Sequence, residues 1–426
     1  MKSQSTDDWA RLDNAGKIFP SNSNKRDTKV FRFACQLNEP VEQSTLQKAL
    51  DITVQEFPLY NSCLRRGLFW YYLKPSRIPA LVTQEHLPPC SSIYDANRYN
   101  LLFQVTYFKN RINFEVYHVL TDGTGALQFL RTLVYHYLCL HHAGELKGKL
   151  PHWDSDASFA QKAEDSFYKY YEKTKKKSTK IPNAYQIRGA KTAENRILIL
   201  EGHTSVKQVL YQAHEYQTTM TGLLSAAFLC ALHKNAPLSQ QRKPIVLMVP
   251  VNLRNHFQSS SMRNFFCTVN IGYNFSTGPD DFESVIASVN QQLKENLTKE
   301  QLAARMNGYS AIERNAFARI TPLFLKDIVM KLAGKRNALK TTGSISNIGK
   351  VTMPPELEPY ISYFDVFIST AKLQTCLCSF HDTLVISFTS AFQSTDVQKD
   401  FFRTLSAMGL PVKILSNEHF GGEATL

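Results

Sequence analysis

The sequence predicts an α+β protein built from two halves of similar plan. Its 426 residues exceed the usual size of one domain, and domain-size statistics favour two or three domains. In the first half, "LLFQVTYF" and "INFEVYHV" alternate apolar and polar residues on either side of "KNR", which predicts a β-hairpin. After Gly125, the residues Leu127, Leu130, Val134 and Leu138 recur at helical spacing and predict a helix with one apolar face.

The segments before this hairpin predict one further strand and one helix. The stretch "KVFRFACQL" (29–37) has the composition of a strand. The stretch "STLQKALDITVQEF" (44–57) is typical of a helix, with Ser44 expected as its N-cap and Pro58 directly after its end.

The second half is predicted to repeat this plan. "RILILEG", "KPIVLMVPVNLR" and "NFFCTVNIGYNF" are strand-like, with helices expected between them and over roughly 280–335. We expect "GSISNIGKV", "FDVFIST" and the hairpin "LQTCLCSF"/"TLVISFTSAF" to complete its sheet. The chain therefore divides into an N-terminal domain (1–160), a polar, lysine-rich crossover or linker (161–195) and a C-terminal domain (196–426).

Composition excludes several classes of protein. Apolar residues make up 43% and charged residues 20% of the chain, which is typical of a globular protein. No apolar run reaches the ~18–20 residues that cross a bilayer, and "MKSQSTDDWARLDNAGKIFP" lacks the apolar core of a signal peptide. We therefore expect a cytoplasmic protein without a transmembrane segment.

The eight cysteines form no C-x₂-C pair, which favours buried reduced thiols and predicts no metal site.

The net charge of +13 predicts an attraction to anions, such as nucleic acid, an anionic membrane, a phosphorylated cofactor or an acidic partner. The densest basic run, "YKYYEKTKKKSTK" (168–180), stands in no recognisable nucleic-acid-binding module. We interpret it as a solvated part of the linker and expect no nucleic-acid partner.

The most informative residues are His118, Asp122 and Gly123, which lie between the second strand of the hairpin and the following helix. A histidine at the end of a strand is rigidly placed, and its usual pKa of about 6.5 leaves it mostly neutral and able to accept a proton. Asp122 is expected to hold the turn in shape, and Gly123 permits the sharp change of direction.

The stretch "YHVLTDGTGALQFLRTL" resembles the HxxxDG motif of the chloramphenicol acetyltransferase-like superfamily, which includes alcohol acetyltransferases and peptide-synthetase condensation domains. Three further stretches resemble segments of members of this superfamily and occur along the chain in the order found there. They are "WARLDNAGKIFP" (9–20), "VPVNLRNHFQSSSMRNFF" (249–266) and "GSISNIGKVTMP" (343–354). The resemblance implies two similar chloramphenicol acetyltransferase-like α/β sandwich domains, a pseudo-dimer that forms a cleft or tunnel.

The resemblance also implies roles for individual residues. His118 would be the general base, reached by the two substrates from opposite ends, and Asp122 would pair with Arg254. Arg263 is a candidate for binding the phosphates of coenzyme A. The candidates for stabilising an oxyanion are Ser344, Ser346 and Asn347.

The activity implied is transfer of an acyl group from acyl-CoA to a small-molecule alcohol or amine, without a permanently bound cofactor and without a covalent acyl-enzyme. We expect a monomer, because a chain of two domains already contains a cleft. Position 117 is tyrosine where condensation domains usually carry a second histidine, and the late DFGWG signature of plant acyltransferases is absent. Both departures favour the alcohol acetyltransferase-like branch. Two alternatives stay open: a donor thioester on an acyl-carrier protein, and a non-catalytic binding protein on the same fold.

Overall fold

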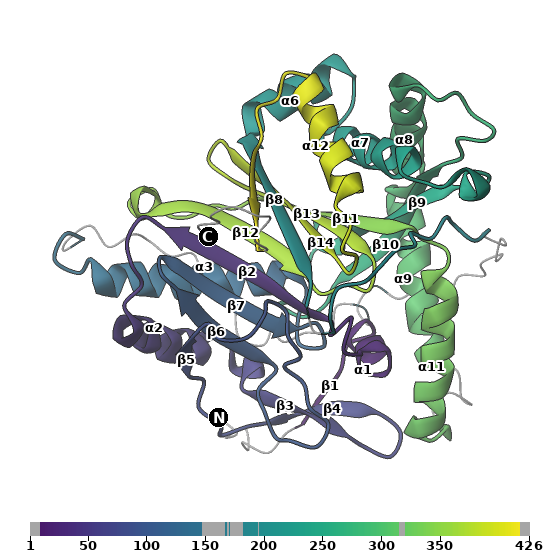
Figure 1. Ribbon diagram of the computed structural model, residues 1–426. Coiled ribbons are helices and arrows are strands. Elements are labelled where there is room, and N and C mark those ends of the chain that lie inside the picture. The colour runs from purple at the N-terminus through teal and green to yellow at the C-terminus, as the bar shows by residue number, and fades with distance from the viewer. Residues whose placement is uncertain are drawn as a thin grey trace.

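Two large β-sheets organise the chain, and helices cover both (Figure 1). The structure is a computed structural model that describes residues 9–146, 167, 170, 182–194, 196–314 and 320–417, with only the backbone described over 309–314. Apart from Tyr170, the predicted basic run at 168–180 lies outside the described residues, and so does most of the predicted linker at 161–195.

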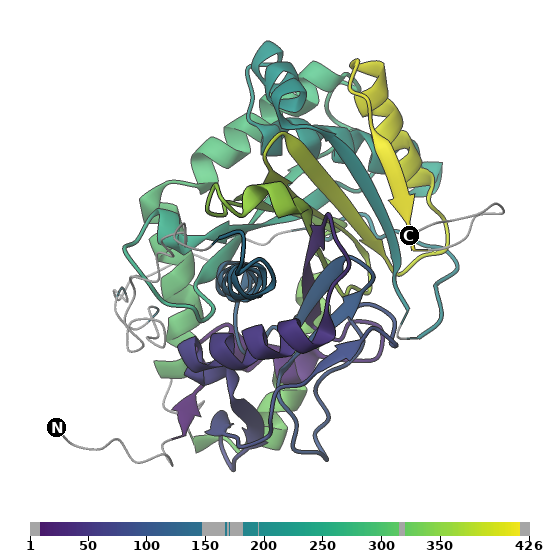
Figure 2. The same ribbon diagram turned by 90° about the vertical axis from the view of Figure 1, so that its left-hand side faces the viewer.

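The first sheet has five strands in the order β12-β2-β7-β6-β5, and all neighbours are antiparallel except β5 and β6. The strands are β2 (Val30–Leu37), β5 (Val82–Gln84), β6 (Phe103–Phe108), β7 (Arg111–Tyr117) and β12 (Ile361–Ile368). Helices α2 (Gln43–Glu56) and α3 (Gly123–His141) pack against each other, and α3 also contacts β2 and β7. Figure 2 looks along α3, which lies near the centre of the molecule.

The second sheet has seven strands in the order β10-β9-β11-β13-β14-β8-β15. Only β11 runs parallel to its neighbours, β9 and β13. Its strands are β8 (Leu198–Ser205), β9 (Ile245–Asn252), β10 (Phe266–Tyr273), β11 (Gly343–Lys350), β13 (Leu373–Phe380), β14 (Thr383–Ser390) and β15 (Lys413–Ser416). Its helices are α6 (Val206–Glu215), α7 (Met220–Lys234), α8 (Phe282–Asn296) and α12 (Asp396–Ala407), and α7 packs against the other three and against β9.

A small third sheet, β1-β4-β3, lies at one end of the molecule. It consists of β1 (Ala10–Arg11), β3 (Ser62–Arg66) and β4 (Tyr71–Pro75). Nearby, the short helix α1 (Phe19–Asn22) packs against α11 (Leu323–Ala338), which follows α9 (Lys299–Arg314) in the chain. No helix in the described ranges combines the length and the apolar character that crossing a membrane requires.

The two large sheets meet at β12, which pairs with β2 and also packs against β13 and β14. Two hydrophobic cores result, one around Phe33 and Phe114 and the other around Phe228 and Phe388. Cys376 and Cys378 of β13 belong to the first core, because alternate residues of a strand point to the same side of the sheet. The halves are therefore joined by shared packing as well as by the chain.

Most of the predicted strands are confirmed, including the hairpin, which forms β6 and β7. Two expectations were wrong. Ser44 is not the N-cap of α2, because the helix begins one residue earlier and Glu42 is the cap residue. "FDVFIST" does not complete the second sheet, since these residues form part of β12 in the first. The boundaries at 160 and 195 stay predictions.

Candidate active site

The turn from β7 to α3 is held by Asp122. β7 ends at Tyr117, His118 follows directly, and α3 begins at Gly123. Asp122 is the N-cap of α3, and its Oδ1 accepts hydrogen bonds from the backbone N–H groups of Thr124 (3.1 Å) and Gly125 (3.2 Å). A carboxylate is favourable there because the first N–H groups of a helix have no partner inside it and carry partial positive charge.

The other oxygen of Asp122 reaches across to the second half of the chain. Oδ2 accepts hydrogen bonds from Arg254 Nη1 and from the backbone N–H of Phe265, both at 2.8 Å. The two charged side chains are only 6% and 9% exposed. Arg254 Nε also donates to the carbonyl of Ser261 at 2.9 Å, so that its guanidinium is fixed from several sides. The pairing that the resemblance implied is present in the structure.

The side chain of Asn264 determines which nitrogen of His118 carries the proton. Asn264 Nδ2 donates to the carbonyl of His118 and to Asp13 Oδ2, each at 3.1 Å. Both of these groups accept hydrogen bonds, so the amide oxygen is the Asn264 atom that faces Nδ1 of His118, at 3.1 Å. Because an amide oxygen only accepts, Nδ1 carries the hydrogen and Nε2 keeps its lone pair.

Three aromatic rings pack against the imidazole of His118. Phe19 stacks on it at a centroid distance of 4.4 Å, Phe31 lies at 4.9 Å and Phe266 at 5.5 Å. His118 is nevertheless half-buried rather than fully enclosed. Burial among apolar groups disfavours the charged form and lowers the pKa of His118 below its usual 6.5. The side chain is thus a neutral imidazole at pH 7, with Nε2 available as a base.

Arg263 does not reach toward solvent as a ligand for phosphate would require. It is 6% exposed, its Nε lies 3.7 Å from Asp13 Oδ2, and it donates to the carbonyl of Arg11. This geometry favours a structural ion pair with the N-terminal segment over the contact to coenzyme A that the sequence suggested.

The oxyanion candidates lie on β11 but face different sides. Asn347 Nδ2 donates to Thr221 Oγ1 of α7 at 2.9 Å, and Ile345 belongs to the second core, so both point into the second half. Alternation along the strand directs Ser344 and Ser346 to the opposite side. Ser344 is buried and Ser346 is partly exposed. Asn347, already bonded to α7, is therefore the weakest of the three candidates.

Sequence reasoning missed Asn264 and Gly125. Asn264 stands inside the "RNFF" part of a recognised stretch, but its contact with His118 spans 146 positions of the chain. A Cβ at Gly125 would lie 2.2 Å from the carbonyl oxygen of Met262, because the start of α3 closely approaches the 261–265 segment. The same Cβ would lie 2.2 Å from Thr121 Oγ1, so both contacts explain the second glycine of "DGTG".

We expect Asp122→Ala to damage the fold as well as turnover. It leaves Arg254 buried without its partner, which costs on the order of 3–5 kcal/mol of unfolding free energy, and it removes the cap of α3. Chemical denaturation measures the loss. Asp281→Ala, which removes the exposed cap of α8, is the matched control and should cost less. An Asp122→Ala protein with wild-type stability and no activity would contradict this view.

Comparison with known proteins agrees with the geometry at the level of fold. No family model matches the chain, and no curated protein matches it. Among solved structures, the TRI3 trichothecene 15-O-acetyltransferase of Fusarium sporotrichioides aligns with a TM-score of 0.64 at 12% identity, over 96% of this chain and 96% of that one.

Two further structures cover similar spans. TRI101 of F. sporotrichioides, complexed with coenzyme A and T-2, has a TM-score of 0.61 at 12% identity over 96% of this chain and 99% of that one. The first condensation domain of the CDA synthetase has a TM-score of 0.58 at 13% identity over 94% and 96%. The chain therefore has the two-domain chloramphenicol acetyltransferase-like fold that these acetyltransferases and condensation domains share.

Proposed function

We propose that the protein is an acyltransferase that moves an acyl group from acyl-CoA to an alcohol or an amine, with His118 as general base. The observation that carries the proposal is the state of His118. Its Nδ1 is held by Asn264, no hydrogen bond from a described residue occupies Nε2, and its pKa is lowered by burial. A neutral imidazole fixed between two halves of this fold is suited to removing a proton from an incoming nucleophile.

The reaction follows from that arrangement. Nε2 takes the proton of the acceptor hydroxyl while its oxygen attacks the thioester carbonyl carbon. The resulting tetrahedral intermediate collapses, the carbon–sulfur bond breaks, and the thiolate receives the proton from the imidazolium. The acyl group passes directly to the acceptor, so no acyl-enzyme forms. Asp122 and Arg254 take no part in proton transfer, and they hold the turn that carries His118.

The developing oxyanion needs hydrogen-bond donors. Ser346 is the best candidate, because it is partly exposed and points away from the second core. Ser344 is buried on the same side of β11 and is the second candidate.

Coenzyme A is our preferred carrier of the acyl group. The similar TRI101 structure contains coenzyme A, and position 117 is the tyrosine that favours the alcohol acetyltransferase-like branch.

The alternative donor is a thioester on a carrier protein. It is supported by the likeness to condensation domains and to polyketide synthase associated protein 5 of Mycobacterium tuberculosis, with a TM-score of 0.58 at 13% identity over 93% of this chain and 96% of that one.

A non-catalytic binding protein is the third possibility, and the geometry of His118 argues against it. A binding protein would have no need of a buried amide that fixes one tautomer of one histidine.

We further propose that the enzyme acts as a monomer, since both halves of the site come from one chain.

The decisive experiment measures thiol release from a panel of acyl-CoAs with alcohol and amine acceptors. His118→Ala should slow transfer by about 10²–10⁴, the usual contribution of a general base. His381→Ala, a change at a largely exposed histidine, is the matched control and should retain wild-type rates. If His118→Ala, folded by circular dichroism, turns over like the wild type, the proposed mechanism is wrong. Turnover only with acyl-carrier-protein thioesters would favour the alternative donor.

The pH dependence of kcat/KM should reflect the lowered pKa of His118. A base with a lowered pKa stays unprotonated to lower pH, so activity should be full at pH 7 and decline only below about 6.5. Rates measured between pH 4.5 and 9 test this, and the residual activity of His118→Ala should lack that acidic limb. An acidic limb centred above pH 7 would show that the base is another group.

A further inference from the structure

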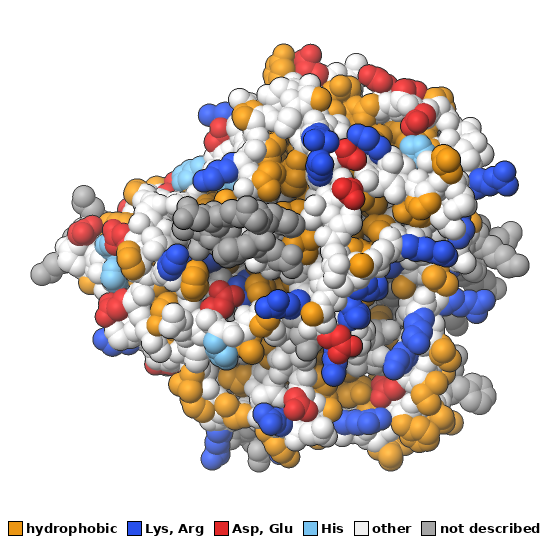
Figure 3. Space-filling view, in the orientation of Figure 1, with side chains coloured by type: hydrophobic (Ala, Val, Ile, Leu, Met, Phe, Trp, Pro, Cys, Tyr) orange, Lys and Arg blue, Asp and Glu red, His pale blue; other side chains and the backbone are white. Residues whose placement is uncertain are grey.

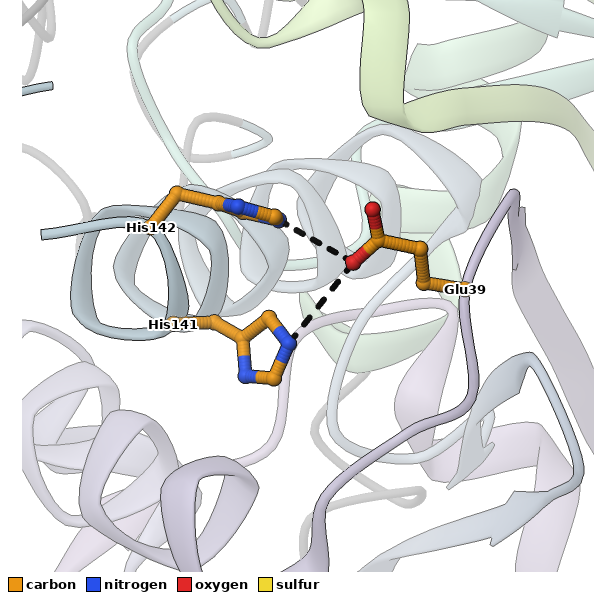
Figure 4. A group of neighbouring side chains, drawn as sticks. All are labelled: Glu39, His141 and His142. Carbon is orange, nitrogen blue, oxygen red and sulfur yellow. Dashed lines mark ion pairs between the residues drawn. The ribbon is translucent and has the colours of Figure 1, made fainter. Parts of the chain in front are cut away.

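A second group of histidines lies at the other end of α3, remote from His118. The helix has 19 residues, so its two ends are roughly 28 Å apart at 1.5 Å per residue. His141 is the last residue of α3 and His142 is its C-cap, while Glu39 lies in the bend after β2. Figure 4 shows both imidazoles directed at the carboxylate of Glu39.

The three side chains present ligand atoms at nearly metal-binding spacing. The Nε2 atoms of His141 and His142 lie 3.7 Å and 3.5 Å from Glu39 Oε2, and all three ligand atoms lie within 4.8 Å of one another. Ligands at ~2.0–2.2 Å from a tetrahedral zinc ion are roughly 3.4 Å apart. A small rotation of the imidazoles therefore suffices to bring the three atoms around one ion.

Aromatic stacking holds both imidazoles in place. His142 stacks on Tyr360 with a centroid distance of 3.8 Å, and His141 stacks on Tyr137 at 5.4 Å. The two imidazole planes are almost perpendicular, at 86°. Two differently oriented rings that direct Nε2 at one oxygen form a convergent donor set.

The opposite nitrogen of each imidazole faces a further carboxylate. His141 Nδ1 lies 3.6 Å from Glu42 Oε2, and His142 Nδ1 lies 3.8 Å from Glu145 Oε2. Metal-binding histidines commonly have such a carboxylate behind the ring, because it orients the ring and makes the ligand nitrogen more basic. Among the described residues, the ion pairs of Glu39, Glu42 and Glu145 involve histidines alone, although the chain carries a net charge of +13.

We propose that Glu39, His141 and His142 bind one Zn²⁺ ion, with water as the fourth ligand. The ion would tie the end of α3 to the bend after β2 and so stabilise the first half of the molecule. The sequence predicted no metal site, because Glu39 is separated from His141 and His142 by about a hundred positions of the chain. It is independent of the proposed chemistry, because the cluster lies at the far end of α3 from His118.

Isothermal titration of the full chain with ZnCl₂, after treatment with chelator and without an affinity tag of histidines, tests the proposal. We expect one equivalent to bind with a dissociation constant in the micromolar range or below. His141→Ala and His142→Ala should each weaken binding by at least ~10-fold. His136→Ala is the matched control, since His136 lies on the same helix but pairs with Glu56, and it should bind Zn²⁺ as the wild type does.

A thermal unfolding readout complements the titration. Zn²⁺ should raise the midpoint of the wild type and of His136→Ala but not that of His141→Ala. Thiol release should be unchanged in all three proteins. The proposal is overturned if the wild type binds no Zn²⁺ or if His141→Ala binds it equally well. Stabilisation by mild acid without any effect of Zn²⁺ would identify protonated imidazoles in simple ion pairs instead.

A second inference comes from the outward face of α11, which is apolar. We call Phe324, Ile328, Val329 and Leu332 the apolar ridge of α11, and these side chains are 55–63% exposed. Phe324, Ile328 and Leu332 follow one another at intervals of four residues, and Val329 lies next to Ile328, so the four side chains share one side of the helix. In Figure 3, apolar side chains and Lys or Arg side chains lie together over the region that α11 occupies in Figure 1.

The opposite side of α11 attaches it to the third sheet. Asp327 Oδ2 accepts a hydrogen bond from Tyr71 Oη at 3.0 Å and pairs with Arg66 at 3.3 Å. Lys326 Nζ donates to the carbonyl of Phe69 at 2.8 Å. The only acidic residue of α11 is thus directed inward, while Lys331 and other cationic residues of the helix are exposed.

We propose that the apolar ridge of α11 docks on an anionic lipid surface. An apolar stripe flanked by exposed cations and free of outward acids complements a layer of acidic headgroups over acyl chains. The net charge of +13 adds to this attraction.

Co-sedimentation with lipid vesicles tests this proposal. The full chain should bind phosphatidylcholine vesicles that contain about 30% phosphatidylglycerol, bind pure phosphatidylcholine less, and dissociate as salt is added. Ile328→Glu and Lys331→Glu should each reduce binding several-fold. Leu210→Glu changes an apolar residue on α6 that is 46% exposed, close to the 55% of Ile328, and should have no effect. Absence of vesicle binding, or a dimer that Ile328→Glu disrupts, would overturn the proposal.

Discussion

The carboxylate of Asp122 is the group on which the site depends. One oxygen caps α3, and the other binds Arg254 and the backbone of Phe265 in the second half of the chain. Because the same carboxylate satisfies both sides, the start of α3 cannot move away from the 253–265 segment without leaving a charge buried and unpaired. His118, four residues before Asp122, is thereby held at the junction of the two halves.

Features of the fold that depend on neighbouring residues could be predicted from the sequence. Features that depend on contacts between residues far apart in the chain could not. The hairpin β6–β7 and the turn after it follow from local alternation and spacing, so His118, Asp122 and Gly123 could be placed on their elements. The partnership of β12 with β2 could not, because a strand pattern does not say which sheet it joins. Ser44 failed as a cap for a local reason, since helix ends are poorly determined by propensity.

Asn264 and Arg263 show the same limit at the scale of side chains. Both belong to a stretch that carries the resemblance, and the sequence favoured the arginine as a ligand because its charge suits a phosphate. In the structure the arginine pairs with Asp13, while the uncharged neighbour determines the tautomer of His118. Their roles are fixed by the packing of residues 11–19 against 261–266, and no short-range pattern contains that information.

The ion pair of Asp122 and Arg254 also affects the chemistry of His118. The negative charge of Asp122 raises the pKa of His118, whereas burial among Phe19, Phe31 and Phe266 lowers it, and burial prevails. Had the carboxylate no cationic partner, its field at the imidazole would be stronger and would favour the protonated form. Arg254, which lies 2.8 Å from Asp122 Oδ2, weakens that field while it joins the two halves. Burial keeps the base unprotonated, and the ion pair that positions the base limits how far Asp122 opposes that effect, so the fold and the reactivity of His118 depend on the same pair of charges.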